Sequence, residues 1–135
     1  MKTTFSNLIL TAGDSTFTST KEDFGKWDCN RWRVTVKNTD NGKSTWFYYY
    51  TGTAHSGLVN DREMIEALDC FINDARNGLD TFEDFCGEYG YDYDSRRAQK
   101  IWFACKEAWS KFERIGVDFE DLYESVYDFL NGESA

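Results

Sequence analysis

Residues 88–97, EYGYDYDSRR, place two aspartates two positions apart, a spacing shared by the first ligands of a calcium-binding loop. A loop that begins at Asp92 would need an oxygen ligand at its fifth position and glycine at its sixth. Arginines occupy both positions, and two cations cannot share a site for a dication. The stretch instead predicts a helix start. Asp94 or Ser95 would accept hydrogen bonds from the free backbone amides, and Asp92 would favour the positive end of the helix dipole.

The sequence contains one histidine, His55, in the glycine-flanked segment TGTAHSG. A loop histidine could act as a general base, with Ser56 or Thr51 as the nucleophile. However, there is no GxSxG motif, and no carboxylate can be assigned as the partner of the imidazole. The glycine-rich motifs that hold nucleotide phosphates, GxGxxG and GxxxxGK[ST], do not occur either. We therefore expect His55 to be an ordinary loop residue, and the protein to have no enzymatic activity and no cofactor.

The four cysteines show neither a CxxC pair nor tight spacing with histidine, so the sequence predicts no metal site. Cys70, Cys86 and Cys105 fall on helical segments that we expect to bury one face. We therefore predict free thiols in the core at these three positions, as in a protein of a reducing cytosol.

Residues 31–38, RWRVTVKN, alternate between polar and apolar side chains, as a strand with one buried face does. Asn41-Gly42 is the preferred pair of a two-residue type I′ turn, and residues 44–52, STWFYYYTG, are typical of the return strand. The register that this turn predicts pairs Val36 with Phe47 and Val34 with Tyr49 on one face, and Lys37 with Trp46, Thr35 with Tyr48 and Arg33 with Tyr50 on the other. Weaker strand candidates are residues 5–10 and 15–20, with a hairpin around residues 12–14.

From Asp61 onward the apolar residues recur at helical spacing, and the four predicted helices, 61–78, 81–90, 95–116 and 118–132, each end at glycine. The residues expected to point inward are, helix by helix, Met64, Ile65, Leu68, Phe71, Ile72 and Ala75; Phe82, Phe85, Cys86 and Tyr89; Ala98, Ile101, Cys105, Ala108, Phe112 and Ile115; and Phe119, Leu122, Val126, Phe129 and Leu130. The sequence thus predicts an α+β fold, with an antiparallel sheet of three to four strands followed by about four helices. We expect a single domain, 1–135, with a sheet-rich part (1–55) and a helical part (60–132).

The formal net charge is −9, and it is unevenly placed. Residues 1–59 hold seven Lys/Arg and five Asp/Glu, a balance of +2, whereas residues 60–135 hold eight and nineteen, a balance of −11. Closely spaced carboxylates on rigid helices can imitate a phosphate backbone and attract a basic partner. The candidate carboxylates are Glu120, Asp121, Glu124 and Asp128 on the last helix and Glu63, Glu66 and Asp74 on the first. The candidate aromatic anchors are Tyr123, Tyr127 and Trp102.

A second candidate surface is the strand face that carries Arg33, Lys37, Trp46, Tyr48 and Tyr50. If it is exposed, it would suit single-stranded nucleic acid, because bases stack on rings while cations contact phosphates. If it is covered, its arginines would stack on tyrosines inside the protein. The acidic second half argues against direct binding of nucleic acid.

Residues 27 to about 115 contain the segments WDCNRWRVTVKN, FYYYTGTAHSG, ALDCFINDA and TFEDFCGEYGYDYDSRRAQKIWFACKE. This arrangement resembles a family of small proteins found in phage and prophage genomes, and Phe82 to Ala98 is its most specific part. The resemblance implies a phage accessory protein that acts in the host bacterial cytoplasm. The resemblance implies no catalytic residue for this chain. By analogy of class, it implies an inhibitor of host defence, such as an anti-CRISPR or antirestriction protein.

We therefore expect a non-enzymatic inhibitor whose acidic helical surface mimics DNA and binds a host protein or ribonucleoprotein complex with a basic groove. Two alternatives stay open: a nucleic-acid-binding accessory protein that uses the aromatic and basic sheet face, or a small phage structural or assembly protein. The sequence has no apolar run of 18 residues, so we expect no membrane association.

Overall fold

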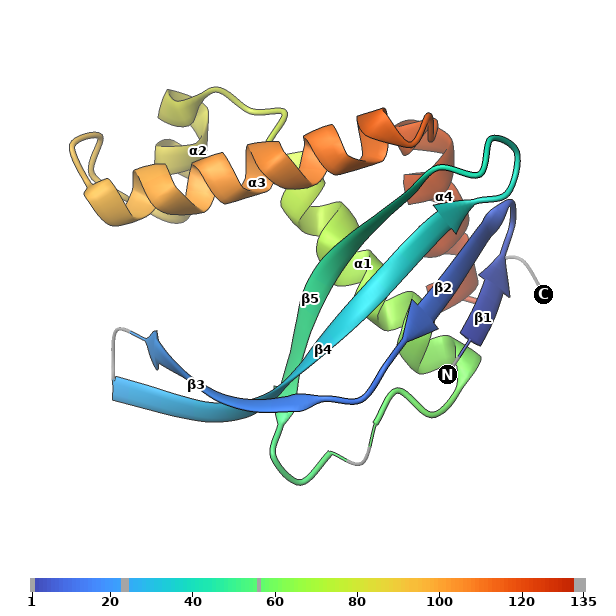
Figure 1. Ribbon diagram of the computed structural model, residues 1–135. Helices are drawn as coiled ribbons and strands as arrows, with labels where there is room; N and C mark the ends of the chain where they lie inside the picture. The colour runs from blue at the N-terminus through green and yellow to red at the C-terminus, as the bar shows by residue number, and fades with distance from the viewer. Residues whose placement is uncertain (1, 23–24, 56, 133–135) are drawn as a thin grey trace. The chain divides into compact units, whose positions relative to one another are not determined.

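The computed structural model describes residues 2–22, 25–55 and 57–132. Five strands in the first part of the chain precede four helices in the second part, as Figure 1 shows by colour from blue to red. This is the α+β class that the sequence predicts, with five strands instead of three or four. The chain divides into two compact units, Met1–Ala67 and Leu68–Ala135, and the boundary falls inside the first helix.

The first unit contains one antiparallel sheet, whose strands are β1 (Lys2–Phe5), β2 (Leu8–Ala12), β3 (Thr16–Glu22), β4 (Gly25–Asn38) and β5 (Ser44–Gly52). Strand β4 is central, because β2, β3 and β5 all pair with it, while β1 pairs with β2. The predicted hairpin around residues 12–14 is therefore wrong, since β2 and β3 do not pair with each other. The tight turn lies earlier, at Ser6 and Asn7, where Ser6 has a φ of 53° and separates β1 from β2.

Between β4 and β5, the four residues 39–42 form the loop that separates the hydrogen-bonded Asn38 and Lys43, so the predicted two-residue turn is wrong. The Asn38 N–H donates to the Lys43 carbonyl over 2.9 Å, and Gly42, with a φ of 74°, donates to the Asn38 carbonyl over 2.8 Å. Val34 consequently lies opposite Phe47. The register differs from the predicted one by two residues, which leaves every side chain on its predicted face.

Side chains set the length of this loop. Asn38 Oδ1 accepts a hydrogen bond from the Asp40 N–H over 3.0 Å, and Asn41 Oδ1 accepts one from the Lys43 N–H over 2.9 Å. Asn7, in the neighbouring turn, donates from Nδ2 to Asn38 Oδ1 over 3.2 Å and to Asp40 Oδ2 over 2.9 Å. These bonds favour the longer loop over a two-residue turn.

One face of the sheet is buried and the other is exposed. Val34 and Val36 of β4 are completely buried, and so are Leu8 and Leu10 of β2, whereas the alternate residues Arg33 and Lys37 of β4 are exposed. On the buried face the Trp32 indole N–H donates to the Thr51 hydroxyl over 2.8 Å, so its polar group is paired.

Helix α1 (Asp61–Asn77) begins in the first unit, where Met64 and Ile65 are buried. Asp61 Oδ1, at its first residue, accepts a hydrogen bond of 2.9 Å from the buried Thr3 hydroxyl of β1. This bond ties the start of the helix to the edge strand of the sheet.

The second unit contains the rest of α1, followed by α2 (Phe82–Tyr89), α3 (Arg96–Arg114) and α4 (Phe119–Leu130). Each of the last three helices begins at a side-chain cap. Ser95 Oγ accepts from the Ala98 N–H over 3.1 Å, as the helix-start interpretation of EYGYDYDSRR predicts. Thr81 and Asp118 cap α2 and α4 in the same way. Gly90, in the left-handed conformation with a φ of 73°, ends α2.

The core of the second unit follows the predicted apolar stripes. The Phe112 ring of α3 lies 4.5 Å from the Phe71 ring of α1 and 5.7 Å from the Phe119 ring of α4, measured between centroids. Two predicted core residues are exposed, and four others, Phe82, Ile101, Phe129 and Leu130, are half-buried. Cys70 is exposed, because it lies two positions, about 200° around the helix, from the buried Leu68.

Tyr89 is the other exception, with 49% of its surface exposed, although its ring remains 5.1 Å from that of Phe85. Cys86 and Cys105 are buried as predicted, and all four cysteines of the chain are free thiols in the structure.

Gly78, directly after α1, lies against the backbone of Cys105, and a Cβ at this position would collide with it. The absence of a side chain therefore allows the end of α1 to approach α3.

Candidate functional site

The acidic surface of helix α4 is the strongest candidate site in the second unit. Phe119, Leu122 and Val126 are buried, so the helix has a fixed inward face. On the remaining surface, three of the predicted carboxylates are exposed, Glu120, Asp121 and Glu124, while Asp128 is half-buried. The Asp118 carboxylate accepts a 3.2 Å hydrogen bond from the Asp121 N–H and fixes the first turn. Burial of one face and a capped start together hold the carboxylates in a rigid row.

No cation interrupts this row along the chain. Residues 115–132 hold five Asp/Glu and no Lys or Arg. The acidity of the second unit is not uniform, however. Residues 77–95 hold six Asp/Glu and no cation, whereas residues 96–114, which form α3, hold six Lys/Arg and two Asp/Glu. The unit therefore alternates acidic, basic and acidic along its sequence, a pattern that the total charge of the second half hides.

A shallow pocket of about 240 Å³ lies beside the carboxylates of α4. The residues that line it are Arg76, Leu79, Phe119, Glu120, Tyr123 and Glu124. Leu79 is 52% exposed, so the pocket offers apolar surface next to two carboxylates. Arg76 also lines the pocket, but its guanidinium is held against Tyr123. The apolar surface and the two carboxylates together suit a Lys or Arg side chain, whose aliphatic part needs apolar contact while its charge needs an anion.

Two of the three predicted aromatic anchors lie on α4, and they differ in their surroundings. The Tyr123 hydroxyl accepts a hydrogen bond from Arg76 Nη1 over 2.6 Å, and the same guanidinium lies 4.7 Å from the centre of its ring. Tyr127 is 51% exposed. Tyr123 is therefore held in place beside the pocket, while Tyr127 presents much of its ring to solvent.

Trp102, the third predicted anchor, is engaged within the second unit. Its indole N–H donates to the Asp80 carbonyl over 3.1 Å, and its ring centroid lies 5.4 Å from that of Phe82. Lys106 Nζ lies 4.3 Å from the centre of the indole. These contacts hold α2 and the segment before it on α3, which gives Trp102 a structural role.

The three carboxylates predicted on α1 are divided between the two units. Glu66 forms an ion pair with Arg62 over 3.2 Å, and both Glu66 and Glu63 belong to the first unit. Asp74 belongs to the second unit. Although much of this residue is exposed, desolvation raises the pKa of its carboxyl.

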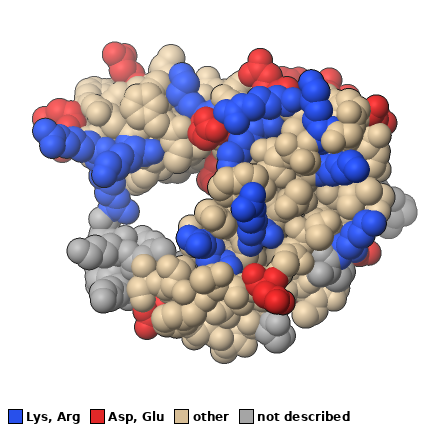
Figure 2. Space-filling model, viewed as in Figure 1, with Lys and Arg blue, Asp and Glu red and all other residues tan. Residues whose placement is uncertain are grey.

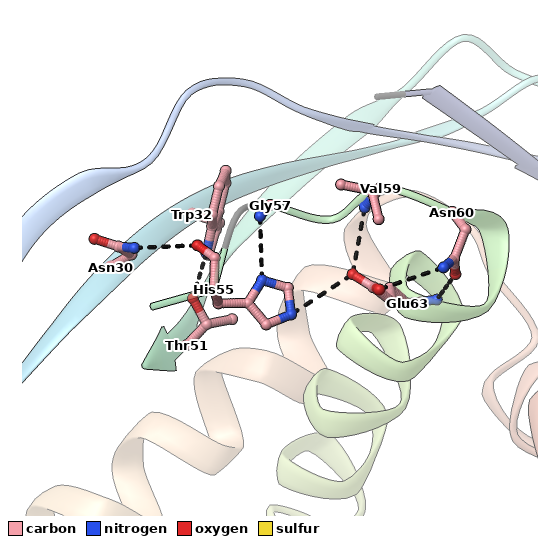
Figure 3. A network of polar contacts seen from close by, with 8 residues as sticks. All are labelled: Asn30, Trp32, Thr51, His55, Gly57, Val59, Asn60 and Glu63. Atoms are coloured by element: carbon pink, nitrogen blue, oxygen red, sulfur yellow. Dashed lines mark hydrogen bonds and ion pairs between the residues drawn. The ribbon is translucent and has the colours of Figure 1, made fainter. Parts of the chain in front are cut away.

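Glu63 is part of a polar network that links the loop after β5 to the start of α1, drawn in Figure 3. His55 Nδ1 accepts a hydrogen bond from the Gly57 N–H over 3.2 Å, and His55 Nε2 lies 3.6 Å from Glu63 Oε2. Glu63 also accepts from the Val59 N–H over 3.3 Å, and its own N–H donates to Asn60 Oδ1 over 2.8 Å.

This network is a variant of the capping box at a helix start: Asn60 Oδ1 accepts from the Glu63 N–H, and the Glu63 carboxylate accepts from the side-chain amide of Asn60 instead of its backbone N–H. Both ring nitrogens of His55 point at groups of the loop and the helix, rather than at a hydroxyl or thiol (Figure 3). Of the two hydroxyls considered as nucleophiles, Thr51 is buried and accepts the Trp32 indole N–H, and Ser56 lies outside the described residues. The arrangement suits a structural role for His55.

The exposed sheet face is the second candidate surface. Tyr48 and Tyr50 are each 39% exposed, Arg33 and Lys37 are exposed, and Trp46 is half-buried. The face also includes Arg31, which was not among the predicted surface residues although it lies two positions before Arg33 on the same side of β4.

The pocket beside α4 contains three residues that were not predicted to belong to a functional site, Arg76, Leu79 and Phe119. Nothing in the pattern of acidic residues points to them.

Within residues 2–22, 25–55 and 57–132, no group of three or more His, Cys, Asp or Glu side chains is arranged to hold a metal ion. In the same part of the chain, no helix is both long and apolar enough to cross a bilayer.

Comparisons of the chain with protein-family models, with curated proteins and with solved structures found no match. The resemblance to phage accessory proteins thus remains a prediction.

Proposed function

We propose that the protein is a phage-encoded, non-enzymatic inhibitor that binds a host defence complex of the CRISPR or restriction type. Its working surface is the acidic side of α4, and the partner offers a basic groove that normally holds nucleic acid. The observation that carries the proposal is the row of exposed carboxylates, Glu120, Asp121 and Glu124, in a segment with no Lys or Arg, beside a pocket with an apolar wall.

The spacing of the row supports mimicry of a polyanion. Glu120 and Glu124 of the row are four residues apart, and the half-buried Asp128 follows four residues later, so successive Cα atoms are spaced by about 6 Å along one side of the helix. The helix is anchored by its buried face, so the backbone that carries the carboxylates loses little conformational freedom on binding. A fixed row of negative charges attracts a basic groove over a distance of about a Debye length, which speeds association.

Charge alone does not give high affinity, because an exposed ion pair contributes only about 0.2–1 kcal/mol. The pocket beside the row supplies the additional apolar contact. A Lys or Arg of the partner can place its aliphatic chain against Leu79 and Phe119 and its charge near Glu120 and Glu124. The exposed ring of Tyr127 provides a further contact of the kind that dominates binding energy at interfaces.

The test is a plating assay on a panel of bacterial hosts, each of which carries one defined CRISPR–Cas or restriction system. Expression of the full chain should raise the plating efficiency of a targeted phage by about a hundredfold or more on at least one host. The same phage on the isogenic host without the defence system is the control. A panel in which the protein protects no phage on any host contradicts the proposal.

A matched pair of charge-neutralising variants then tests the surface. Glu120→Gln with Glu124→Gln should reduce protection by about tenfold or more, because both carboxylates line the pocket. Glu83→Gln with Glu113→Gln removes the same charge from exposed positions of α2 and α3 and should leave protection within about twofold. Equal losses in both pairs would show that net charge, rather than the α4 surface, is what matters.

A further inference from the structure

The exposed face of the sheet carries a row of cations beside a row of aromatic rings. We call this surface the sheet platform, and its residues are Arg31, Arg33 and Lys37 of β4 and Trp46, Tyr48 and Tyr50 of β5. Figure 2 shows Lys and Arg side chains over these strands, on the face turned to the viewer. The platform lies wholly within the first unit.

The arginines of the platform are stacked on its rings. The Arg31 guanidinium carbon lies 4.3 Å from the centre of the Tyr48 ring, and that of Arg33 lies 4.4 Å from the centre of the Trp46 ring. Trp46 and Tyr48 meet edge to face, with 5.0 Å between centroids. The stacking covers one side of each guanidinium but leaves N–H groups at its edge available to an anion.

The strand register explains why the Tyr50 ring carries neither of these guanidinium groups, unlike the rings of Trp46 and Tyr48. Arg31 is paired with Tyr50 across the strands but stacks on Tyr48, and Arg33 is paired with Tyr48 but stacks on Trp46. Both guanidinium groups thus lean the same way along β5. Tyr50 stands at the end of the row, 39% exposed, and carries neither guanidinium on its ring.

The charge of the platform is local and of one sign. Its three cations lie on one strand, with Arg31 and Arg33 about 6.8 Å apart along the chain. The positions next to these residues on the same face are neutral, and they are Thr35, Ser44, Ile9, Thr11 and Thr16. Residues 1–67 as a whole hold eight Lys/Arg and eight Asp/Glu, so the unit itself is neutral and does not repel an anion as the second unit does.

We propose that the sheet platform binds single-stranded nucleic acid. Arg31, Arg33 and Lys37 contact successive backbone phosphates, and an unpaired base stacks on the ring of Tyr50. The chemistry favours a single strand over other polyanions, because a duplex hides the faces of its bases and an acidic protein surface has none to offer. This activity is independent of the α4 surface, since the two use different residues in different units.

The direct test is fluorescence anisotropy of the full chain with labelled single-stranded DNA and RNA of about 12 nucleotides, a length within the site sizes of small single-strand-binding folds. A duplex of equal length is the comparison. Both single strands should bind at least about tenfold more tightly than the duplex at about 50 mM salt. The slope of log K against log salt should be about −2, because three phosphate contacts each contribute about −0.7.

Two variants separate stacking from charge. Tyr50→Ala should weaken binding about fivefold or more, and Tyr50→Phe, which keeps the ring, should stay within about twofold of the wild type. Arg33→Ala should make the salt slope shallower by about 0.7. Arg62→Ala, which removes an exposed cation of the same unit away from the platform, should leave the slope unchanged.

Binding that is equal for duplex and single strand, or that is unaffected by Tyr50→Ala, would overturn the proposal and indicate a general attraction for polyanions. Absence of any anisotropy change at low salt would overturn it as well. Glu120→Gln with Glu124→Gln should leave oligonucleotide binding unchanged, so failure of the platform and failure of the α4 surface can be told apart.

Discussion

Arg76 donates a hydrogen bond of 2.6 Å to the Tyr123 hydroxyl, and its guanidinium lies 4.7 Å from the centre of the same ring. This double contact connects the last turn of α1 to the middle of α4 inside the second unit. Both residues line the pocket that also exposes Leu79. The contact therefore fixes the wall of the pocket against which, in the proposed function, a cationic side chain of the partner would lie.

Tyr123→Phe should reduce the free energy of unfolding by about 0.5–1.5 kcal/mol, because it removes the hydrogen bond but keeps the ring beneath the guanidinium. Urea denaturation of the full chain measures the difference. Tyr127→Phe is the matched control on the same helix, and its effect should stay within about 0.5 kcal/mol, as is usual for exposed positions. A larger effect at Tyr127 than at Tyr123 would contradict the assigned contact.

Two glycines of the second unit should respond to alanine in opposite ways. Gly78→Ala should destabilise the protein by about 1–3 kcal/mol, since the new methyl group would collide with the backbone of Cys105. Gly87→Ala should stabilise it by about 0.5–1 kcal/mol, because Gly87 lies within α2 and a Cβ there meets nothing within 4 Å. Thermal or urea unfolding compares the two. Similar effects of the same sign would show that α1 and α3 do not approach each other at Gly78.

The thiols should differ sharply in reactivity. Burial and the charge of Asp74 raise the pKa of Cys105 to about 11, so at pH 8 this thiol stays protonated in the folded protein and is a poor nucleophile. Cys70 is exposed and should react first with iodoacetamide, as peptide mass spectrometry would show. All four cysteines should react after unfolding without reductant. Labelling of Cys105 as fast as Cys70 in the folded state would contradict the packing described.

The raised pKa of Cys105 also predicts a pH dependence of stability. In the unfolded chain the thiol ionises near its ordinary pKa of 9.0, but in the folded protein only near 11. The free energy of unfolding should therefore fall as the pH rises from about 9 to about 11. Cys105→Ala should make this fall less steep in urea titrations at several pH values. An identical dependence in the variant would assign the effect to other groups.

His55→Ala should leave the biological effect within about twofold, because the imidazole contacts the loop and the helix start rather than a nucleophile. The plating assay measures the effect, and circular dichroism checks the fold. A loss of several orders of magnitude in a folded variant would contradict the structural role and reopen the hypothesis of an enzyme centred on this histidine.

The elements of the second unit could be predicted from the sequence because their signals are local. Ser95, Thr81 and Asp118 accept the backbone N–H three residues ahead, a bond that depends only on the residue type and its place before an apolar run. The position of Cys70 was predicted wrongly, since its exposure depends on where it lies around α1. The helical period alone would have placed it on the polar side.

The register of β4 and β5 shows why the first unit was harder to predict. Asn41-Gly42 favours a two-residue turn when only neighbouring residues are considered. The observed loop depends on Asn7, more than thirty positions earlier, which bonds to Asn38 and Asp40. A contact between residues so distant in the sequence leaves no trace in a local pattern.

The candidate site was predictable only in part for the same reason. The carboxylates of α4 follow from helical spacing, because one face of that helix is apolar. The pocket depends on Arg76 and Leu79, which come from the end of α1, and only the folded second unit brings them beside Tyr123. The pairing of Glu63 with the His55 loop was equally hidden.

The most direct test of the central claim reverses the charge of the α4 row. The plating assay would compare three proteins for inhibition. They are the wild type, the triple variant Glu120→Lys, Glu124→Lys and Asp128→Lys, and the double variant Arg33→Glu and Lys37→Glu of the sheet platform. We predict that the triple variant loses inhibition while its melting temperature changes by only a few degrees, and that the double variant loses much less. If the double variant loses inhibition while the triple variant keeps it, the α4 surface is not the inhibitory surface.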